Sequence, residues 1–295
     1  MTRERRYRIE AAAAAIAAGL LRRLPRRLVL AAGRFFGRAW GRIDARHRRI
    51  AIDNLRASFP DWSPERLESV ARGVYAHFGA VIFDLLWMAD RSGPELAALV
   101  DVEGDENVRV AQAAGKGAIY FTGHLGNWEI HGIVHGLRFG PLSAVARPLE
   151  NPALDMRLCA LRSVTGNGVI YKRKALATVL RELRASRGVA MVLDQNVLPE
   201  DGIFVDFFGR KAATTTVAAA LALKTGCALV PAWTELQRNG RYRLRYEPAL
   251  EVRADADREA EVARLTQEVA ARTESWIRRV PDQWLWLHRR WKTQP

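Results

Sequence analysis

The sequence predicts an α/β fold, in which a largely parallel sheet is flanked by helices and preceded by an N-terminal helical region. Residues 1–100 show helical patterns only, whereas from about residue 116 short apolar runs alternate with helical segments. Almost every residue within these runs is apolar, as in the strands of a parallel sheet that is covered on both faces. We therefore expect a basic helical region over residues 1–100 and an α/β domain over residues 101–295.

The composition excludes several classes of protein and suggests one kind of partner. The chain has 295 residues, of which 49% are hydrophobic and 26% charged, and this is a globular rather than a disordered or collagen-like composition. The net charge of +14 is uneven, because residues 1–50 hold 14 arginines and only three acidic residues. Such a basic end points to an anionic partner: membrane headgroups, nucleic acid or an acidic protein.

The uncharged runs are too short for a clear membrane span. Residues 11–21 form a run of 11 residues, mostly alanine, and residues 73–83 form another of the same length. A spanning helix needs about 20 apolar residues. The N-terminus also lacks a clear cleavage site for a secretory signal. The sequence therefore does not support a lone spanning helix and leaves membrane association open.

A second helix is expected from about residue 26. Arginines recur at positions 26, 34, 38, 42 and 46, so they share one stripe of that helix. Phe36, Trp40 and Ile43 follow helical spacing on another stripe. A helix of this kind can lie in the membrane interface, and an ordinary surface helix packed on the protein is the alternative. Further along, Ser63 and Pro64, followed by two acids, predict a helix start near Ser63.

The elements of the α/β domain are predicted from the spacing of apolar residues, which alternates between short continuous runs and helical spacing. The expected strands cover residues 117–122, 142–147, 168–172, 189–193, 227–234 and 242–246. The expected helices cover residues 128–137, 151–164, 175–186, 214–225 and 258–280. A long loop is expected over residues 194–213. Gly226 is expected to end the helix over residues 214–225.

Two cysteines, Cys159 and Cys227, lie far apart in apolar contexts. Neither belongs to a CxxC pair or to a group with the spacing of metal ligands. We expect both to be buried reduced thiols, as in a protein of a reducing compartment.

The segment that says most about chemistry runs over residues 121–129. His124 follows an expected strand, and Glu129 lies in the first turns of the next expected helix. On one continuous helix two side chains at this spacing point about 140° apart, so they meet only if His124 lies in a turn, which Gly123 and Gly126 permit. Glu129 would then hold one imidazole nitrogen and leave the other as a general base.

Two other interpretations of these histidines stay open. His131 and His135 have the i, i+4 spacing that can hold a metal, although neither HExxH nor its reverse is present, so we expect no metal. His124 could also be a strand-end histidine with a purely structural hydrogen bond.

Five segments, in order along the chain, resemble the lipid A late acyltransferases (lauroyl/myristoyl type) of the lysophospholipid acyltransferase superfamily. They are RIAIDNLRASFP at 49–60, GHLGNWE at 123–129, RPLENP at 147–152, DQ at 194–195 with FFG at 207–209, and PDQWLWLHRRW at 281–291. The HxxxxE motif alone is weak, but five elements in the family's order are a strong resemblance that covers most of the chain.

The resemblance implies a glycerol-3-phosphate-acyltransferase-like fold and an acyl transfer that needs neither metal nor organic cofactor. A fatty acyl chain would move from a thioester, on acyl carrier protein or coenzyme A, to a hydroxyl of a lipid A precursor. His124 would be the general base and Glu129 its orienter. The alternatives are an acyltransferase of another glycolipid, such as a phosphatidylinositol mannoside, and a catalytically inactive membrane-binding member, which the intact His124 and Glu129 disfavour.

Two departures from the related families matter. Many members have a clear N-terminal membrane-spanning segment, which is short and rich in alanine here. The glycerolipid branch usually has aspartate at the position of Glu129 and a proline-glutamate-glycine motif after the third strand. That motif is missing here, which argues against a glycerolipid substrate.

Further residues are candidates for binding the substrate. The backbone N–H groups of Gly126 and Asn127, at a helix N-terminus, are candidate donors to the oxyanion of the intermediate. Arg147, Asp194 and Gln195 follow expected strands, and strand ends line the ligand crevice of open sheets. For Arg147 the alternative is a surface ion pair with the nearby glutamate 150, and for Asp194 and Gln195 it is a structural role.

Four further groups of residues are candidates for contact with the substrate or the membrane. Asn151 belongs to the RPLENP segment and is a candidate for substrate binding through the resemblance alone. The basic residues 172–174 could meet a substrate phosphate or simply form a solvated helix start. Phe207 and Phe208 could line an acyl channel or fill the core, and Trp284 and Trp286, which alternate as in a strand, could form a membrane belt or pack inside.

The expected partners follow from charge and resemblance together. They are an anionic membrane surface, a thioester donor and a glycolipid acceptor. Nucleic acid is the rival partner of an arginine-rich region, and the apolar stripe and the five matched segments count against it. We expect the protein at the cytoplasmic face of a bacterial inner membrane, as a peripheral or monotopic protein or with a single N-terminal anchor.

Overall fold

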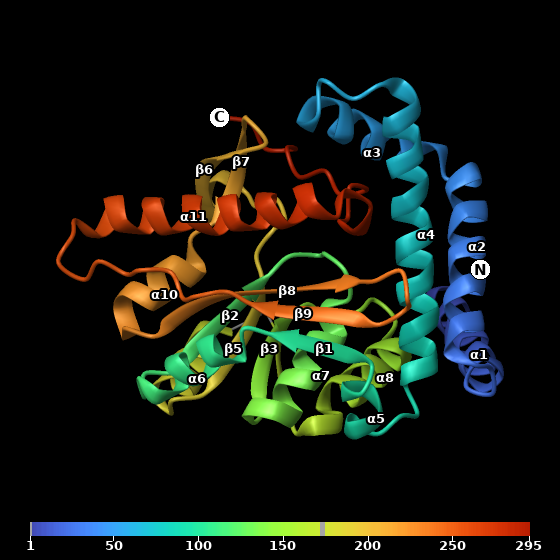
Figure 1. Cartoon of the computed structure of the whole chain (residues 1–295), viewed down its shortest axis with the longest axis horizontal. Helices are drawn as coiled ribbons and strands as arrows, with labels where there is room; N and C mark the ends of the chain where they lie inside the picture. Colours follow the sequence, from blue (N-terminus) through green and yellow to red (C-terminus); the bar gives the residue numbers. More distant parts are fainter. Residues whose placement is uncertain (1, 172–174) are drawn as a thin grey trace.

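The computed structural model describes residues 2–171 and 175–295. Its N-terminal part is helical and stands across one end of a sheet, as Figure 1 shows. The helices of this part are α1 (Arg3–Leu21), α2 (Arg26–Ile43), α3 (Ala45–Ser58), α4 (Pro64–Met88) and α5 (Gly93–Ala97). The predicted start near Ser63 is confirmed, because the Ser63 side chain caps α4 by accepting from the backbone N–H of Arg66.

Helices α2 and α4 touch through their backbones. A Cβ atom at Gly33 would lie 2.5 Å from the carbonyl oxygen of Gly79, and one at Gly37 would overlap the carbonyl oxygen of Tyr75. Because the buried face of α2 consists largely of glycines, its large apolar side chains point outward. Phe35, Phe36, Trp40 and Ile43 are 56–74% exposed. Helix α2 therefore packs on the protein, as one of the two interpretations expected, but through its glycine face, and Phe36, Trp40 and Ile43 stay more than half exposed.

Helix α4 is the one described helix long and apolar enough to cross a membrane by length and composition. Counting only the uncharged run over residues 73–83 underestimated it, since the helix has 25 residues. In this fold 44% of its most apolar window is buried, against α2 and against the sheet domain.

The sheet of the described residues has seven strands in the order β1-β9-β8-β2-β5-β3-β4. Their bounds are β1 Val100–Glu103, β2 Ala118–Thr122, β3 Leu142–Ala146, β4 Gly168–Tyr171, β5 Gly188–Val192, β8 Ala228–Leu236 and β9 Tyr242–Tyr246. Neighbouring strands are parallel except β8 and β9. The predicted largely parallel α/β fold is confirmed.

Helices cover both faces of the sheet. They are α6 (Asp105–Ala113), α7 (Trp128–Phe139), α8 (Pro152–Arg162), α9 (Ala175–Arg184), α10 (Val217–Thr225) and α11 (Arg258–Arg279). In Figure 1, α11 runs along one side of the sheet, with α6 and α7 on the other. Two hydrophobic clusters fill the two sides, as expected for strands such as β2, in which all five residues are buried.

Several sequence expectations were wrong in detail. The region 194–213 is not one loop, because β6 (Gly202–Phe207) and β7 (Arg210–Thr215) form an antiparallel hairpin within it. This hairpin packs on α11, and tertiary contact decides its conformation. As a result α10 begins at Val217 instead of residue 214. Strand β1 and helix α6 were also not foreseen. Of the two cysteines, Cys227 is buried but Cys159 is only partly buried.

The C-terminal aromatic residues are internal. Trp284 and Trp286 are at most 1% exposed; Trp284 contacts the buried ring of Phe207 and Trp286 that of Phe208, around the β6–β7 turn. Instead of a strand, the segment has a short 3-10 turn (Pro281–Gln283) and one isolated bridge, Leu125 to Trp284. The C-terminal segment thereby pins the loop that follows β2.

Candidate active site

Two polar side chains leave neighbouring strands at the same edge of the sheet. His124 follows β2 and Asp194 follows β5, and these strands pair in parallel with Thr122 opposite Val192. The imidazole Nδ1 of His124 lies 2.7 Å from Oδ1 of Asp194. The backbone N–H of His124 donates to Oδ2 at 2.6 Å. Strand register alone thus places the two groups, although 70 residues separate them.

The Asp194 carboxylate is ionised and fixed. It is 2% exposed and also accepts a hydrogen bond from the Trp284 indole Nε1–H, at 2.7 Å. Burial opposes its ionisation, but the charge of His124 and the hydrogen bonds it accepts outweigh burial and lower the pKa of Asp194 to about 2. The carboxylate therefore holds the Nδ1 proton of the imidazole.

The other imidazole nitrogen, Nε2, contacts Gln195. The side chain of His124 is 19% exposed, and its Nε2 lies 3.4 Å from the amide nitrogen of Gln195. Burial lowers the pKa of His124, but Asp194, with a smaller contribution from Glu129, raises it above its ordinary value. With the proton held on Nδ1, Nε2 carries the lone pair, which accepts a long hydrogen bond from the Gln195 amide at the carboxyl edge of the sheet.

Glu129 does not hold the imidazole as the sequence suggested. Both of its oxygens pair with Arg162, at 2.6 Å and 2.7 Å, and one accepts from the Trp128 indole N–H at 3.1 Å. The Trp128 ring packs edge-on against His124, with centroids 4.9 Å apart. Closeness in sequence favoured Glu129 as the orienter, but the neighbouring strand brings Asp194 to Nδ1 instead.

Arg162, at the end of α8, was not foreseen as a functional residue. Its side chain is 14% exposed, and its Nη1 is buried without a hydrogen-bond partner among the described residues. An unpaired guanidinium nitrogen in a buried site is costly unless a ligand completes it. Its position after RPLENP gave no signal, because only the folded helix α8 brings it to Glu129.

The turn between His124 and α7 depends on its glycines. A Cβ atom at Gly123 would lie 3.0 Å from Oδ2 of Asp194, so a larger residue would push the carboxylate from His124. Gly126 has φ of +61°, and a Cβ there would overlap the carbonyl oxygen of Thr234. Asn127 caps α7, its side-chain oxygen accepting from the N–H groups of Glu129 and Ile130.

The two N–H groups expected to bind the oxyanion are already engaged. Gly126 N–H donates to the carbonyl of Gln283 at 3.1 Å, and Asn127 N–H donates to the hydroxyl of Thr234 at 3.2 Å. They hold the turn in place and are not free donors. The expectation failed because Thr234 and Gln283 come from distant parts of the chain.

Helix α4 reaches the same turn through two buried contacts. His77 Nε2–H donates to the carbonyl of Gly126 at 3.0 Å. Asp84 accepts from the Tyr242 hydroxyl at 2.7 Å, and that hydroxyl accepts from the Asn127 amide at 3.1 Å. Arg26 of α2 neutralises Asp84 through two hydrogen bonds, at 2.7 Å and 2.8 Å. The helical region thus helps to position the cap of α7.

Comparison with known proteins identifies the family of this site. The family model of bacterial lipid A biosynthesis acyltransferases matches residues 2–293. The chain belongs to this family. It is therefore an acyltransferase, as its five matched segments had suggested.

This lipid A biosynthesis acyltransferase family member is similar to several curated proteins. It is 28% identical to a lipid A biosynthesis lauroyltransferase of Escherichia coli, over 94% of this chain and 89% of that one. It is 24% identical to a lipid A biosynthesis acyltransferase of Haemophilus influenzae, over 82% and 74%. It is 29% identical to a phosphatidylinositol mannoside acyltransferase of Mycobacterium tuberculosis, over 77% and 71%.

Not all residues expected in the acyltransferase site come together. Arg147 is exposed after β3, and among the described residues it has no ion pair; glutamate 150 pairs with Arg6 instead. Asn151 is buried and caps α8, while its amide donates to the backbone of Tyr7 and to Glu10 of α1. Asn151 therefore joins α1 to α8. The basic residues 172–174 lie outside the described residues.

The histidines of α7 are buried away from this pair. Burial lowers the pKa of His131 to about 4 and, together with the charge of His131, that of His135 to about 3, so both are neutral at pH 7. His135 Nδ1 contacts the hydroxyl of Tyr246 at 2.9 Å. Within residues 2–171 and 175–295, no group of three or more His, Cys, Asp or Glu residues is arranged to hold a metal ion.

Proposed function

We propose that the protein transfers a fatty acyl chain from an acyl thioester, carried by acyl carrier protein, to a hydroxyl of a lipid A precursor, with His124 as the general base. The observation that carries this proposal is the imidazole of His124, which is held on Nδ1 by a buried carboxylate and is 19% exposed. An alcohol is a poor nucleophile at neutral pH and needs such a base within hydrogen-bond reach.

The proposed reaction has two proton transfers. Nε2 of His124 takes the proton of the acceptor hydroxyl while its oxygen attacks the thioester carbonyl, forming a C–O bond and an oxyanion. When the tetrahedral intermediate collapses, the C–S bond breaks and Nε2 returns the proton to the leaving thiolate. Asp194 fixes the tautomer and stabilises the imidazolium that forms between the two steps.

We assign the stabilisation of the oxyanion to Arg162. Its guanidinium is held by Glu129, and Nη1 is left as a buried donor that has no partner in the part of the chain that the structure describes. A pre-oriented cation at the developing charge lowers the barrier without reorganising during the reaction. In this proposal Glu129 acts on the oxyanion side through Arg162, and its charge also raises the pKa of His124.

We propose that the protein works at a membrane surface, at the cytoplasmic face of the bacterial inner membrane. The outward face of α2 supports this, because Phe35, Phe36, Trp40 and Ile43 are exposed on a helix rich in arginine. Aromatic and aliphatic side chains next to arginine suit the interface of an anionic bilayer.

A second acceptor remains a candidate function. The phosphatidylinositol mannoside acyltransferase of M. tuberculosis is 29% identical to this chain and the E. coli lauroyltransferase 28%. Identity therefore does not separate the two acceptors. Mass spectrometry of lipids from cells that lack the gene does: loss of one secondary acyl chain from lipid A supports the proposal, and loss from another glycolipid supports the second candidate.

The base is tested by His124→Ala in a purified transfer assay. Without a general base the rate is expected to fall by about 100-fold or more. His135→Asn, buried away from the catalytic pair and in contact with the Tyr246 hydroxyl, is the matched control for the loss of one imidazole. Wild-type activity of His124→Ala would refute the mechanism.

A further inference from the structure

A cavity of about 420 Å³ opens beside the catalytic pair. It is lined by Arg46, His47 and Ile50 of α3, by Asn196 of the loop after β5, and by Leu287, His288, Arg289 and Lys292 of the C-terminal segment. Three separate parts of the chain thus meet in one cavity, whose volume lies within the range of small-molecule sites, about 300–1,000 Å³.

The cavity carries an excess of positive charge. Among the described residues, no carboxylate pairs with Arg46, Arg289 or Lys292, whereas His47 is held by Asp44 at 2.8 Å. Arg46 also stands in the first turn of α3, whose N-terminus is already capped by the Asp44 carboxylate, so the positive charge offered to a ligand comes from the three side chains. The arrangement suits a compact group with more than one negative oxygen, such as a phosphate.

The cavity is connected to the reacting atoms. Asn196 follows Gln195 directly, and the amide of Gln195 contacts Nε2 of His124. His288, on the other wall, lies close enough for the charges of Asp194 and His124 to act on it. A molecule held in the cavity would therefore lie next to the base.

The cavity lies close in sequence to the apolar face of α2. Arg46 comes three residues after Ile43, which is 74% exposed, and Trp40 is 60% exposed one turn earlier. If this face enters the interface of a bilayer, Arg46 lies at the depth of the lipid headgroups. The thioester donor arrives from water, so a group that binds at headgroup depth belongs to the lipid.

We infer that the cavity binds a phosphate group of the lipid acceptor and thereby places its hydroxyl at His124. This inference rests on the proposed transfer to a lipid and adds the headgroup that the site recognises. Arg46, Arg289 and Lys292 neutralise the phosphate, while the acyl chains remain in the bilayer beside α2. The cavity is a specificity site, since it acts on the binding of the acceptor and not on the proton transfer.

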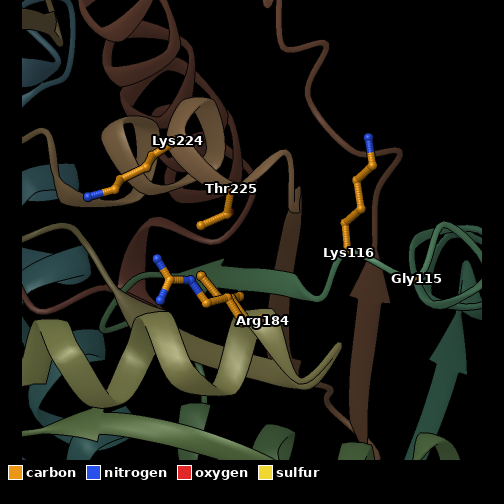
Figure 2. Close-up of a pocket in the computed structure, with 6 residues that line it drawn as sticks. Gly115, Lys116, Arg184, Lys224 and Thr225 are labelled. Carbon is orange, nitrogen blue, oxygen red and sulfur yellow. The ribbon is translucent and has the colours of Figure 1, made fainter.

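The chain offers a charge-matched control at the opposite edge of the sheet. A second cavity, of about 310 Å³, is lined by Lys116, Arg184 and Lys224, together with Gly115, Leu183 and Thr225. Figure 2 shows the three cationic side chains coming from separate elements. Replacing them removes the same charge as replacing Arg46, Arg289 and Lys292, without touching the cavity beside His124.

The experiment compares Arg46→Gln/Arg289→Gln/Lys292→Gln with Lys116→Gln/Arg184→Gln/Lys224→Gln. Initial rates are measured with a phosphorylated glycolipid acceptor and with the same lipid after removal of its phosphates. In the first variant we expect KM for the phosphorylated acceptor to rise about tenfold or more, with kcat and the donor KM unchanged. The preference for the phosphorylated lipid should disappear, whereas the second variant should retain it.

A binding assay separates this inference from the proposed reaction. Each triple variant is combined with His124→Ala and mixed with phosphatidylcholine vesicles that carry either form of the lipid. Phosphate-dependent binding that is lost only in the variant of the cavity beside His124 supports the inference, even if no acyl transfer is detected. Equal losses in both variants, unchanged preference, or an effect on the donor KM alone would overturn it.

Discussion

The two edges of the sheet both carry a cavity lined by cationic side chains, but they differ in the groups that lie next to these side chains. At the carboxyl edge, Arg46, Arg289 and Lys292 line a cavity that also contains Asn196, the residue after the Gln195 that contacts the partly buried His124. At the amino edge, Arg184 and Lys224 stand in the last turns of α9 and α10. Basic residues there compensate the negative ends of the helix dipoles.

This comparison shows that a cluster of cations is not by itself a site. The amino edge needs no ligand to explain its charges, because the helix ends explain two of the three. The carboxyl edge combines charge with a fixed tautomer, a partly exposed imidazole and a buried Nη1 on Arg162 that has no hydrogen-bond partner among residues 2–171 and 175–295. Substitutions at the carboxyl edge should therefore change the chemistry, and those at the amino edge should not.

The largest expected effect is that of Asp194→Asn. An amide no longer fixes the tautomer or stabilises the imidazolium, so kcat/KM is expected to fall by about 100-fold or more. Lys224→Gln at the amino edge is the control, with activity within about twofold of wild type, as for most surface substitutions. If Asp194→Asn stayed within this range, the catalytic distinction between the edges would be lost.

The next largest effect is expected for Arg162→Lys. An ammonium group cannot keep two bonds to Glu129 and also offer a third, fixed donor, so kcat should fall by about tenfold to 100-fold with little change in KM. Arg157→Lys, on the exposed side of the same helix, controls for the loss of a guanidinium. A change in KM alone would place Arg162 in substrate binding instead.

A smaller effect is expected for Tyr242→Phe, which breaks the link from Asp84 to Asn127. Two buried partners lose a hydrogen bond, which costs about 1–3 kcal/mol of stability. Because Asn127 caps α7, kcat should also fall, by about tenfold or less. Tyr246→Phe removes a buried hydroxyl that contacts His135; it should cost similar stability and leave kcat unchanged, and a fall in both variants would make the effect one of folding alone.

The smallest effect concerns pH. The base must be neutral, so kcat/KM should decline as pH falls through the pKa of His124, which lies above its ordinary value. In Glu129→Gln one negative charge that raises this pKa is lost, and the inflection should move to lower pH. Lys116→Gln, at the amino edge, should leave it in place. A shift of the inflection to higher pH in Glu129→Gln would contradict the electrostatic role of Glu129.

Much of this molecule follows from local patterns. The continuous apolar runs predicted β2, β5 and β8, since strands covered on both faces need apolar side chains at every position. The turn at His124 also followed from its two glycines. In contrast, the β6–β7 hairpin is stabilised by packing on α11, and no local signal separates it from a loop.

The partners within the site were less accessible to sequence reasoning. Glu129 is five residues from His124, yet it pairs with Arg162. Asp194 was recognised as a strand-end residue, but its contact with Nδ1 requires the strand order, in which β5 lies next to β2. The order of strands in a sheet depends on long-range packing, so the matched DQ segment indicated the residue without its role.

The glycine contact between α2 and α4 has a mechanical consequence. At Gly33, Gly37 and Gly79 the two helices meet backbone against backbone, so no side chain at these positions can rearrange to absorb a displacement. A push on the exposed aromatic rings of α2 would therefore move α4 as well, and with it His77, which grips the carbonyl of Gly126. Contact of α2 with lipid and the position of the turn that carries His124 are in this way mechanically coupled.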